Sequence, residues 1–211
     1  MANDEPPILW VLAGASGAGK SSIGGAMIRR RGADYFDPDE TAAMLRATGT
    51  LAAQADAEAW NIGRALLERA IEQRLDFAIE TTLGGRTMPA LLREAATRGF
   101  VVNVWFVGLA SAELHIARVR ARAGRGGHDV DDATIRRRWD TCRENLIDLL
   151  PFLAEVRIFD NSAHGDPHAG QPPAPRELAY LVRGRIARRC AEVATPAWVK
   201  PILAAAMNLA P

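Results

Sequence analysis

Lysine is nearly absent from this chain of 211 residues. Lys20 and Lys200 are the only two, so arginine supplies 24 of the 26 basic residues. The basic residues balance 25 acidic ones, which leaves a formal net charge of +1. With so small a net charge, the chain as a whole does not attract nucleic acid or an acidic membrane surface. Neither is therefore an expected partner, and a function that depends on charge must come from a local arrangement.

Cysteine and long apolar stretches are scarce as well. Cys142 and Cys190 cannot form a disulfide framework, and neither has the neighbouring cysteine or histidine of a zinc site. No apolar run approaches the roughly 18 residues of a membrane-spanning helix, and the first residues lack the features of a secretory signal. With 48% apolar residues, the sequence predicts a globular, cytoplasmic protein.

Short apolar runs alternate with segments of helical periodicity along most of the chain. Strands are expected at 8–13, 35–36, 76–80, 100–107 and 156–159, and helices at 21–31, 60–71, 88–97, from 111 onward and 135–150. Strands that alternate with helices imply right-handed crossovers and a parallel sheet covered on both faces. The sequence therefore predicts an α/β fold, a three-layer αβα sandwich with a central parallel sheet of about five strands.

Two segments interrupt this alternation. Residues 118–128 are basic, contain three glycines and have few core-forming residues, so they are expected to form a mobile connector. Residues 163–211 are expected to form a C-terminal appendage, a loop followed by helices at about 176–193 and 198–209. The predicted organisation is a P-loop domain at 1–162, with a lid at about 118–138, and the appendage at 163–211.

The clearest motif runs from Gly14 to Ser21 and matches G-x-x-x-x-G-K-[ST] between a predicted strand and a predicted helix. Its glycines allow backbone N–H groups to converge on phosphate at a helix N-terminus. Lys20 would add a positive charge at the β- and γ-phosphates, and the Ser21 hydroxyl would bind Mg²⁺. ATP and Mg²⁺ are the expected cofactors, and the predicted nucleotide-binding residues are Gly14, Ala15, Ser16, Gly17, Ala18, Gly19, Lys20, Ser21 and Ser22.

Acidic residues follow two other predicted strands. Asp37-Pro-Asp39-Glu40 comes after one of them, and Glu80-Thr-Thr82 ends the other. Because parallel strands end at one edge of the sheet, these groups should face the phosphate turn. Asp39 is the candidate base for the proton of an acceptor hydroxyl, although Asp37 or Asp39 could instead cap the next helix. Glu80 could hold a Mg²⁺-bound water or a substrate hydroxyl, and the threonines offer further hydrogen bonds.

Arginines gather in the predicted lid. They are Arg118, Arg120, Arg122, Arg125, Arg136, Arg137 and Arg138. Guanidinium groups on a lid can bind the transferring phosphoryl group and exclude water, whereas a charged segment can also be simply a solvated surface. The chain has neither an N-K-x-D nor a D-x-x-G sequence, which argues against a GTPase. A small-molecule kinase is the favoured function, with a nucleotide-binding regulatory module as the alternative.

From Leu9 to Ser162 the sequence resembles the zeta toxin family of P-loop kinases, in a short single-domain form. The resemblance rests on an ordered series: the phosphate turn, Asp37-Pro-Asp-Glu, Gly63-Arg, Phe77-Ala-Ile-Glu-Thr-Thr-Leu, Arg118 to Arg122 before Gly126-Gly-His, Ile135-Arg-Arg-Arg and Phe159-Asp-Asn-Ser. It implies ATP-dependent phosphorylation of a sugar hydroxyl on UDP-N-acetylglucosamine. It also implies an antitoxin protein that occludes the nucleotide site.

The resemblance assigns roles by position. Lys20 is the phosphate lysine, Ser21 the Mg²⁺ ligand, Asp39 the base, Glu80 a contact of the sugar nucleotide and Arg122 a lid arginine. His128 stands where larger toxins have a second lid arginine, so Arg125 or one of 136–138 would substitute. An acceptor of another kind, such as a nucleoside or an antibiotic, remains the nearer alternative. The expected catalytic residues are Lys20, Asp39 and Arg122, and the expected substrate-binding residues are Asp39, Arg64, Glu80, Thr81, Thr82 and Arg86.

Overall fold

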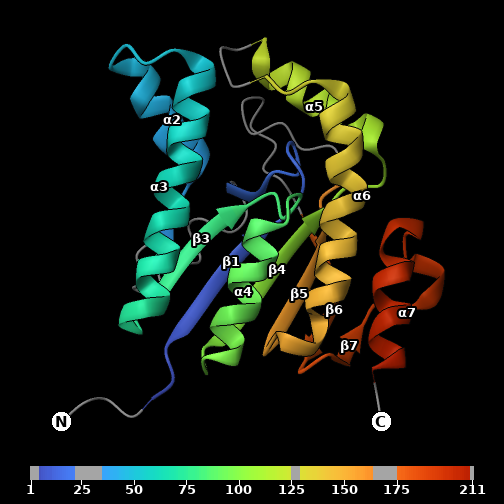
Figure 1. The fold of residues 1–211 in the computed structure, drawn as a ribbon. Coiled ribbons are helices and arrows are strands. Elements are labelled where there is room, and N and C mark those ends of the chain that lie inside the picture. Colours follow the sequence, from blue (N-terminus) through green and yellow to red (C-terminus); the bar gives the residue numbers. More distant parts are fainter. Residues whose placement is uncertain (1–4, 22–34, 125–128, 164–174, 210–211) are drawn as a thin grey trace.

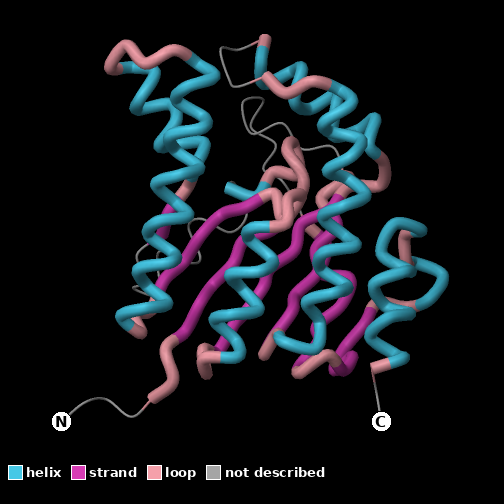
Figure 2. The backbone as a smooth tube through the Cα atoms, in the orientation of Figure 1, coloured by secondary structure: helices cyan, strands magenta, loops and turns pink. Residues whose placement is uncertain are grey.

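A seven-stranded sheet forms the centre of the molecule (Figures 1 and 2). The computed structural model describes residues 5–21, 35–124, 129–163 and 175–209. Five parallel strands come in the order β2-β3-β1-β4-β5. They are β1 (Ile8–Ala13), β2 (Tyr35–Phe36), β3 (Phe77–Thr81), β4 (Val101–Gly108) and β5 (Glu155–Asp160). The predicted α/β fold with a parallel sheet of about five strands is confirmed.

Residues along β1 alternate between two apolar clusters, one on each face of the sheet. Leu9 and Val11 belong to the large cluster, which includes residues of α4 (Thr87–Thr97) and α6 (Asp132–Leu149). Leu12 belongs to the other cluster, with Trp105 of β4. This alternation is the period-2 pattern of a strand buried on both faces. The helix expected at 21–31 would pack on the sheet, but 22–34 lies outside the described residues.

Capping side chains set the starts of three helices. Asp37 caps α2 (Pro38–Ala47), Ser111 caps α5 (Ala112–Ala123) and Asp131 caps α6. In each case a side-chain oxygen accepts a backbone N–H of the first turn, which would otherwise lack a partner. The long helix α3 (Ala52–Gln73) follows α2 and packs against it.

The connector expected at 118–128 is helical for half of its length. α5 continues to Ala123, and the prediction for 118–123 is therefore wrong. Its buried face explains the difference, because Ile116 and Val119 pack against Ile135 of α6. Ile116 and Val119 are three positions apart, so they lie on the same face of the helix. Residues 125–128, which include Arg125 and His128, lie outside the described residues.

The segment expected to be a helix at 176–193 is instead an antiparallel hairpin, so that prediction is wrong. Its strands, β6 (Arg176–Val182) and β7 (Arg185–Arg189), extend the sheet from β5. Arg183 and Gly184 join them with φ of 49° and 75°, the conformation of a tight two-residue turn. Leu178 and Leu181 of β6 are buried in the same large cluster as Leu9.

The chain ends in short helical segments beside this hairpin. They are η4 (Glu192–Ala194), η5 (Ala197–Val199) and α7 (Lys200–Asn208), and a further short segment, η2 (Leu150–Phe152), lies earlier in the chain between α6 and β5. The helix expected at 198–209 is confirmed, and Trp198 and Ile202 fix it to the large cluster. No helix in the described part of the chain combines the length and apolarity that a bilayer crossing requires.

Candidate functional site

The turn after β1 needs glycine at three positions. Gly14, Gly17 and Gly19 have φ of 142°, 82° and 84°, which favour a residue without a side chain. A Cβ on Gly14 would lie 2.1 Å from the carbonyl oxygen of Val107, so β4 leaves no room for one. Such a turn between a strand and a helix start is the backbone arrangement that cradles phosphate.

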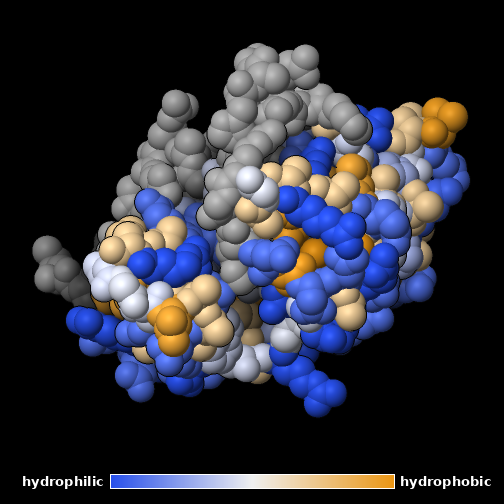
Figure 3. Space-filling view, turned by 90° about the horizontal axis from the view of Figure 1, so that it is seen from above, coloured by the Kyte–Doolittle hydropathy of each residue, from blue (hydrophilic) through white to orange (hydrophobic). Residues whose placement is uncertain are grey.

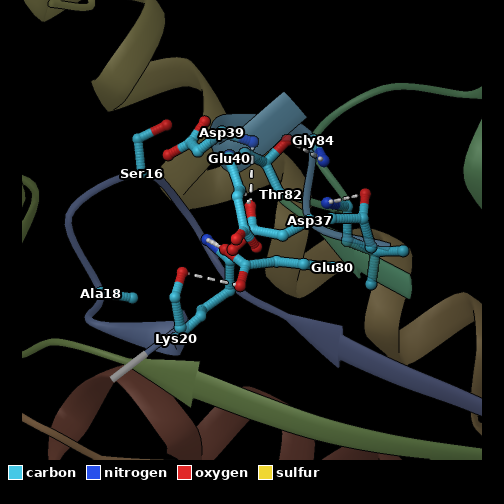
Figure 4. A network of polar contacts seen from close by, with 12 residues as sticks. Ser16, Ala18, Lys20, Asp37, Asp39, Glu40, Glu80, Thr82 and Gly84 are labelled. Atoms are coloured by element: carbon cyan, nitrogen blue, oxygen red, sulfur yellow. Dashed lines mark hydrogen bonds and ion pairs between the residues drawn. The ribbon is translucent and has the colours of Figure 1, made fainter. Parts of the chain in front are cut away.

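Glu80, at the end of β3, is the centre of a buried polar network (Figure 4). The Lys20 ammonium lies 3.4 Å from Oε1, and both side chains are more than nine-tenths buried. The Ser21 hydroxyl donates to Oε2 over 2.9 Å, and the Tyr35 hydroxyl donates to the same oxygen over 2.8 Å. The phosphate turn, β2 and β3 thus meet at one carboxylate, as expected for strand ends at a common edge.

The donor set at Glu80 fits a magnesium ion. A hydroxyl oxygen on Ser21 and a carboxylate oxygen on Glu80 lie within hydrogen-bond distance, and both are hard ligands of the type that Mg²⁺ prefers. Among the described residues, no group of three or more His, Cys, Asp or Glu side chains is gathered to hold a metal by itself. Where Mg²⁺ binds with a nucleotide, the protein usually supplies one or two ligands and the substrate phosphates supply others.

The two aspartates after β2 have different environments. Asp37 is buried, and its Oδ1 accepts the backbone N–H groups of Asp39 and Glu40, so it caps α2. The Asp39 side chain is 54% exposed and pairs with Arg122 of α5 over 2.9 Å. Of the two readings that the sequence leaves open for this pair, the capping role belongs to Asp37.

The residues expected to bind the substrate come from α3, from the end of β3 and from the start of α4. Thr81 ends β3 and Thr82 follows it, and their hydroxyls accept the backbone N–H groups of Leu83 and Gly84. Arg64 on α3 pairs with Glu68, while its Nε is buried with no partner among the described residues. Arg86 is exposed at the start of α4.

The loop after Thr82 is held by α6. Asn145 donates to the carbonyls of Leu83 and Gly85 over 2.7 and 3.0 Å, and Thr141 donates to that of Gly84 over 3.0 Å. Two side chains thus satisfy three consecutive carbonyls, which fixes the loop although it has no regular structure. The sequence analysis assigned no role to either residue.

Arg136, Arg137 and Arg138 of α6 point in different directions. Arg136 lies 3.5 Å from Glu113, and Arg137 donates to Thr134. Arg138 packs against Gly84, where a Cβ would come within 2.8 Å of its Cγ. Burial lowers the pKa of the Arg138 guanidinium, and the charge of Asp39 is among those that oppose this shift. Of the three, Arg138 is therefore the one turned toward the site.

The remaining arginines of the predicted lid bind protein groups. Arg118 donates to the carbonyls of Asn161 and Ala163, and Arg120 pairs with Asp132. Seen from above, the surface that carries α2 and α5 is largely hydrophilic in its described part, with scattered apolar side chains (Figure 3). Ser22 and Arg125 lie outside the described residues.

Three further polar residues at the site escape sequence reasoning. Tyr35 contacts Glu80, His115 contacts the carbonyl of Ser16, and Asn161 contacts that of Ala18. Tyr35 could have been found, because it begins the short predicted strand that leads into the acidic motif. His115 had no signal, since it lies on a helix 99 residues away from its partner.

These features together define a P-loop phosphotransferase with a hydroxyl acceptor: a glycine-rich phosphate turn, a lysine and a serine beside it, and an acid at the edge of a parallel sheet. The family comparison is specific. The chain belongs to the zeta toxin family, whose model matches residues 1–163. An uncharacterized protein of Haemophilus influenzae is 29% identical over 142 residues, which are 62% of this chain and 96% of that protein.

Solved structures share the fold. A chain of the AvrRxo1-ORF1:-ORF2 structure with ATP aligns with a TM-score of 0.62 and 15% identity, over 87% of this chain and 61% of that one. A chain of the PezAT chromosomal toxin-antitoxin system of Streptococcus pneumoniae aligns with a TM-score of 0.53 and 17% identity, over 75% and 70%. The chain thus spans less than two thirds of the AvrRxo1 chain, and at these identities the likeness shows the fold alone.

Proposed function

We propose that this protein transfers the γ-phosphate of ATP to a sugar hydroxyl, of UDP-N-acetylglucosamine in particular, and that residues 1–162 carry the reaction. One observation supports this most strongly. Lys20, Ser21 and Glu80 converge at the phosphate turn, and Asp39 stands at the same edge of the sheet in contact with a lid arginine. Family membership supports the acceptor class, and the AvrRxo1 structure with ATP supports the choice of nucleotide.

The proposed reaction uses these side chains in distinct ways. The oxygen of the acceptor hydroxyl bonds to the γ-phosphorus, and Asp39 accepts the proton of that hydroxyl. At the same time the bond between the γ-phosphorus and the bridging oxygen breaks, and ADP leaves. Lys20 contacts the β- and γ-phosphates once they replace Glu80 as its partner. Ser21 and Glu80 would hold Mg²⁺, which neutralises charge on the phosphates when bound.

Arg122 and Arg138 are the proposed lid arginines. Arg122 is within reach of the reacting groups because it already contacts Asp39, and Arg138 is turned toward the same site. Guanidinium groups so placed stabilise the charge that spreads over the transferring phosphoryl group. Arg64, Thr81, Thr82 and Arg86 are proposed to line the acceptor site.

The acceptor is tested by incubation of the protein with ATP, Mg²⁺ and a panel of sugar nucleotides, nucleosides and antibiotics, followed by phosphorus NMR. We expect the wild type to form a new phosphomonoester on UDP-N-acetylglucosamine. The Lys20→Ala variant should form none. If a nucleoside or an antibiotic is phosphorylated instead, UDP-N-acetylglucosamine is not the acceptor. ATP binding with no product from any compound would favour the regulatory module.

A protein partner and a cytoplasmic location are also proposed. The PezAT system is described as a toxin-antitoxin pair, and family membership extends the idea of a neutralising partner to this chain. Co-expression with the product of an adjacent short reading frame tests the partner. Restored growth and a co-purified complex are the expected results.

A further inference from the structure

The phosphate turn presents its carbonyl groups to the protein. When successive N–H groups of a turn converge on phosphate, the planar peptide bonds direct their carbonyls to the outer side. Buried carbonyls need hydrogen-bond donors. In this turn the backbone supplies one, because the Ala18 N–H donates to the Ala15 carbonyl over 3.2 Å. Two others receive donors from outside the turn.

Those donors are His115 of α5 and Asn161, which follows β5. The His115 Nδ1 lies 2.8 Å from the Ser16 carbonyl, and the Asn161 Nδ2 lies 2.9 Å from the Ala18 carbonyl. Both residues are almost fully buried, with exposed fractions of 1% and 2%. Burial lowers the pKa of His115 to about 4, so at neutral pH the imidazole has one N–H, which must lie on Nδ1 to face a carbonyl.

Each donor packs against a glycine next to the carbonyl that it binds. A Cβ on Gly17 would lie 2.8 Å from the backbone oxygen of His115, and one on Gly19 would lie 2.6 Å from Nδ2 of Asn161. The positive φ of these glycines and the two donors therefore belong to one close-fitting arrangement. Neither donor could stay in place if the turn adopted another backbone conformation.

Both residues are costly to bury. The His115 Nε2 and the Asn161 Oδ1 have no hydrogen-bond partner among the described residues. The small cavity beside His115, which Trp198 also lines, has no room for a molecule the size of water. A buried polar atom without a partner destabilises the folded protein, and an apolar side chain would avoid this cost. Unlike an apolar side chain, the imidazole and the amide can each form a hydrogen bond to a carbonyl of the turn.

We propose that His115 and Asn161 form a clamp that holds the Ser16 and Ala18 carbonyls outward and so keeps the N–H groups of the turn aimed at the phosphates of ATP. The two halves of the clamp are joined, since Arg118 of α5 donates to the Asn161 carbonyl over 2.7 Å. His115 and Asn161 are thus positioning residues, and the inference rests on the proposed binding of ATP at this turn.

The clamp is tested by the dissociation constant of ATP with Mg²⁺, measured by calorimetry at pH 7.5. His115→Phe keeps a ring of similar size but has no donor, whereas His115→Asn carries a nitrogen at the position of Nδ1. We expect His115→Phe and Asn161→Ala each to raise the dissociation constant about tenfold, the loss of one hydrogen bond to a buried carbonyl. His115→Asn should stay within about threefold of the wild type.

Trp198→Phe is the matched control. Trp198 lines the same cavity and its Nε1 also has no partner among the described residues, but it makes no hydrogen bond to the turn. Its replacement should leave ATP binding within about threefold. In the clamp variants the KM for ATP should follow the dissociation constant, while kcat at saturating ATP stays within about threefold, because positioning of the turn acts on binding.

Equal ATP binding by His115→Phe and the wild type, or equal weakness of His115→Asn and His115→Phe, would overturn the clamp. If His115→Phe does not fold, Asn161→Ala decides, and wild-type binding in that variant would overturn it as well. The dissociation constants are measured without an acceptor. A wild-type protein that binds ATP but phosphorylates nothing would therefore reject the proposed function and leave the clamp to be judged by its own variants.

Discussion

Asp37 and Asp39 show how two identical side chains two positions apart take different roles. The first is buried as a helix cap, and the second reaches the lid arginine. Serine also caps helices, but its hydroxyl cannot accept a proton at neutral pH. We expect Asp37→Ser to keep near-wild-type turnover and Asp39→Ser to lower kcat about a thousandfold, with ATP binding unchanged in both.

Single-turnover kinetics and ATP calorimetry on the two variants check this prediction. Because both variants replace aspartate with serine, a difference in their turnover depends only on which aspartate was replaced. A large loss of kcat in Asp37→Ser together with normal turnover in Asp39→Ser would mean that Asp37, and not Asp39, is the base.

Glu80 and Lys20 depend on each other while no nucleotide is bound. Their side chains are only 7% and 8% exposed, so Glu80→Gln leaves a buried ammonium without its carboxylate. Breaking such a pair costs about 3 kcal/mol. Thermal unfolding without ligand should therefore shift to lower temperature. Tripolyphosphate without Mg²⁺ should restore stability more in Glu80→Gln than in the wild type, since it supplies the missing negative charge.

Tyr35→Phe is the control for this prediction, because it removes one hydrogen bond to Glu80 and keeps both charges. It should cost about 1 kcal/mol and respond to tripolyphosphate as the wild type does. An equal response in Glu80→Gln would mean that Lys20 is not held by the carboxylate.

His115 makes stability depend on pH. Burial, with the nearby charges of Lys20, Arg118 and Arg143, lowers its pKa from 6.5 to about 4. Between these values the unfolded chain binds a proton that the folded protein does not, so the contribution is complete above pH 6.5 and is lost as the pH falls toward 4. Urea unfolding at pH 7 and 4.5 should show about 2 kcal/mol more loss in the wild type than in His115→Asn, which has no titrating ring. Equal losses would contradict the burial of a neutral imidazole.

At the scale of helices and strands, local signals decided what the sequence could predict. The parallel strands and the phosphate turn were predictable, since short apolar runs and a glycine motif can be recognised without knowing a distant partner. The β6–β7 hairpin was missed because its turn is Arg183-Gly184, and only the second residue is one that turns favour. The end of α5 was missed because it is rich in basic residues and its buried residue, Val119, packs against Ile135 on another helix.

The same distinction holds in the site. Lys20, Ser21 and Glu80 follow from motifs at strand ends, and the fold brings them together as predicted. The hydrogen bonds of His115 and Asn145 depend on how α5 and α6 pack, and residue spacing alone does not contain that information. Sequence reasoning therefore predicted which side chains meet at the phosphate turn and missed His115 and Asn145, which contact the backbone of the surrounding loops.

The hairpin turn can be tested by one substitution. Gly184 has a φ of 75°, where a Cβ is unfavourable, so Gly184→Ala should destabilise the protein by about 1 kcal/mol in urea unfolding. Arg183 has a φ of 49°, which asparagine tolerates better than arginine. Arg183→Asn should therefore keep or raise stability, and a loss as large as that of Gly184→Ala would contradict the turn geometry.

At the scale of the whole molecule, the hydrophobic core includes residues beyond the stretch of sequence that the family model matches. The family model ends at residue 163, yet β6 pairs along the whole of β5. Leu178, Trp198 and Ile202 lie in the same cluster as Leu9 of β1. A chain that ends at Ser162 would expose the edge of β5 and this part of the core, and such edges favour aggregation. We expect that chain to be insoluble or to unfold without cooperativity.

Removal of only 200–211 separates the two contributions of the C-terminal region. It keeps β6 and β7 on the edge of β5 but removes Ile202 and Leu203 from the large cluster. Loss of two buried aliphatic side chains should cost several kcal/mol, about 2–5 for each, and lower the unfolding temperature. Because the phosphate turn contacts no residue of α7 by hydrogen bond or ion pair in the described part of the chain, ATP binding at low temperature should persist. Circular dichroism and calorimetry on the two shortened chains check this, and a folded, ATP-binding chain of 1–162 would show that the core does not need the hairpin.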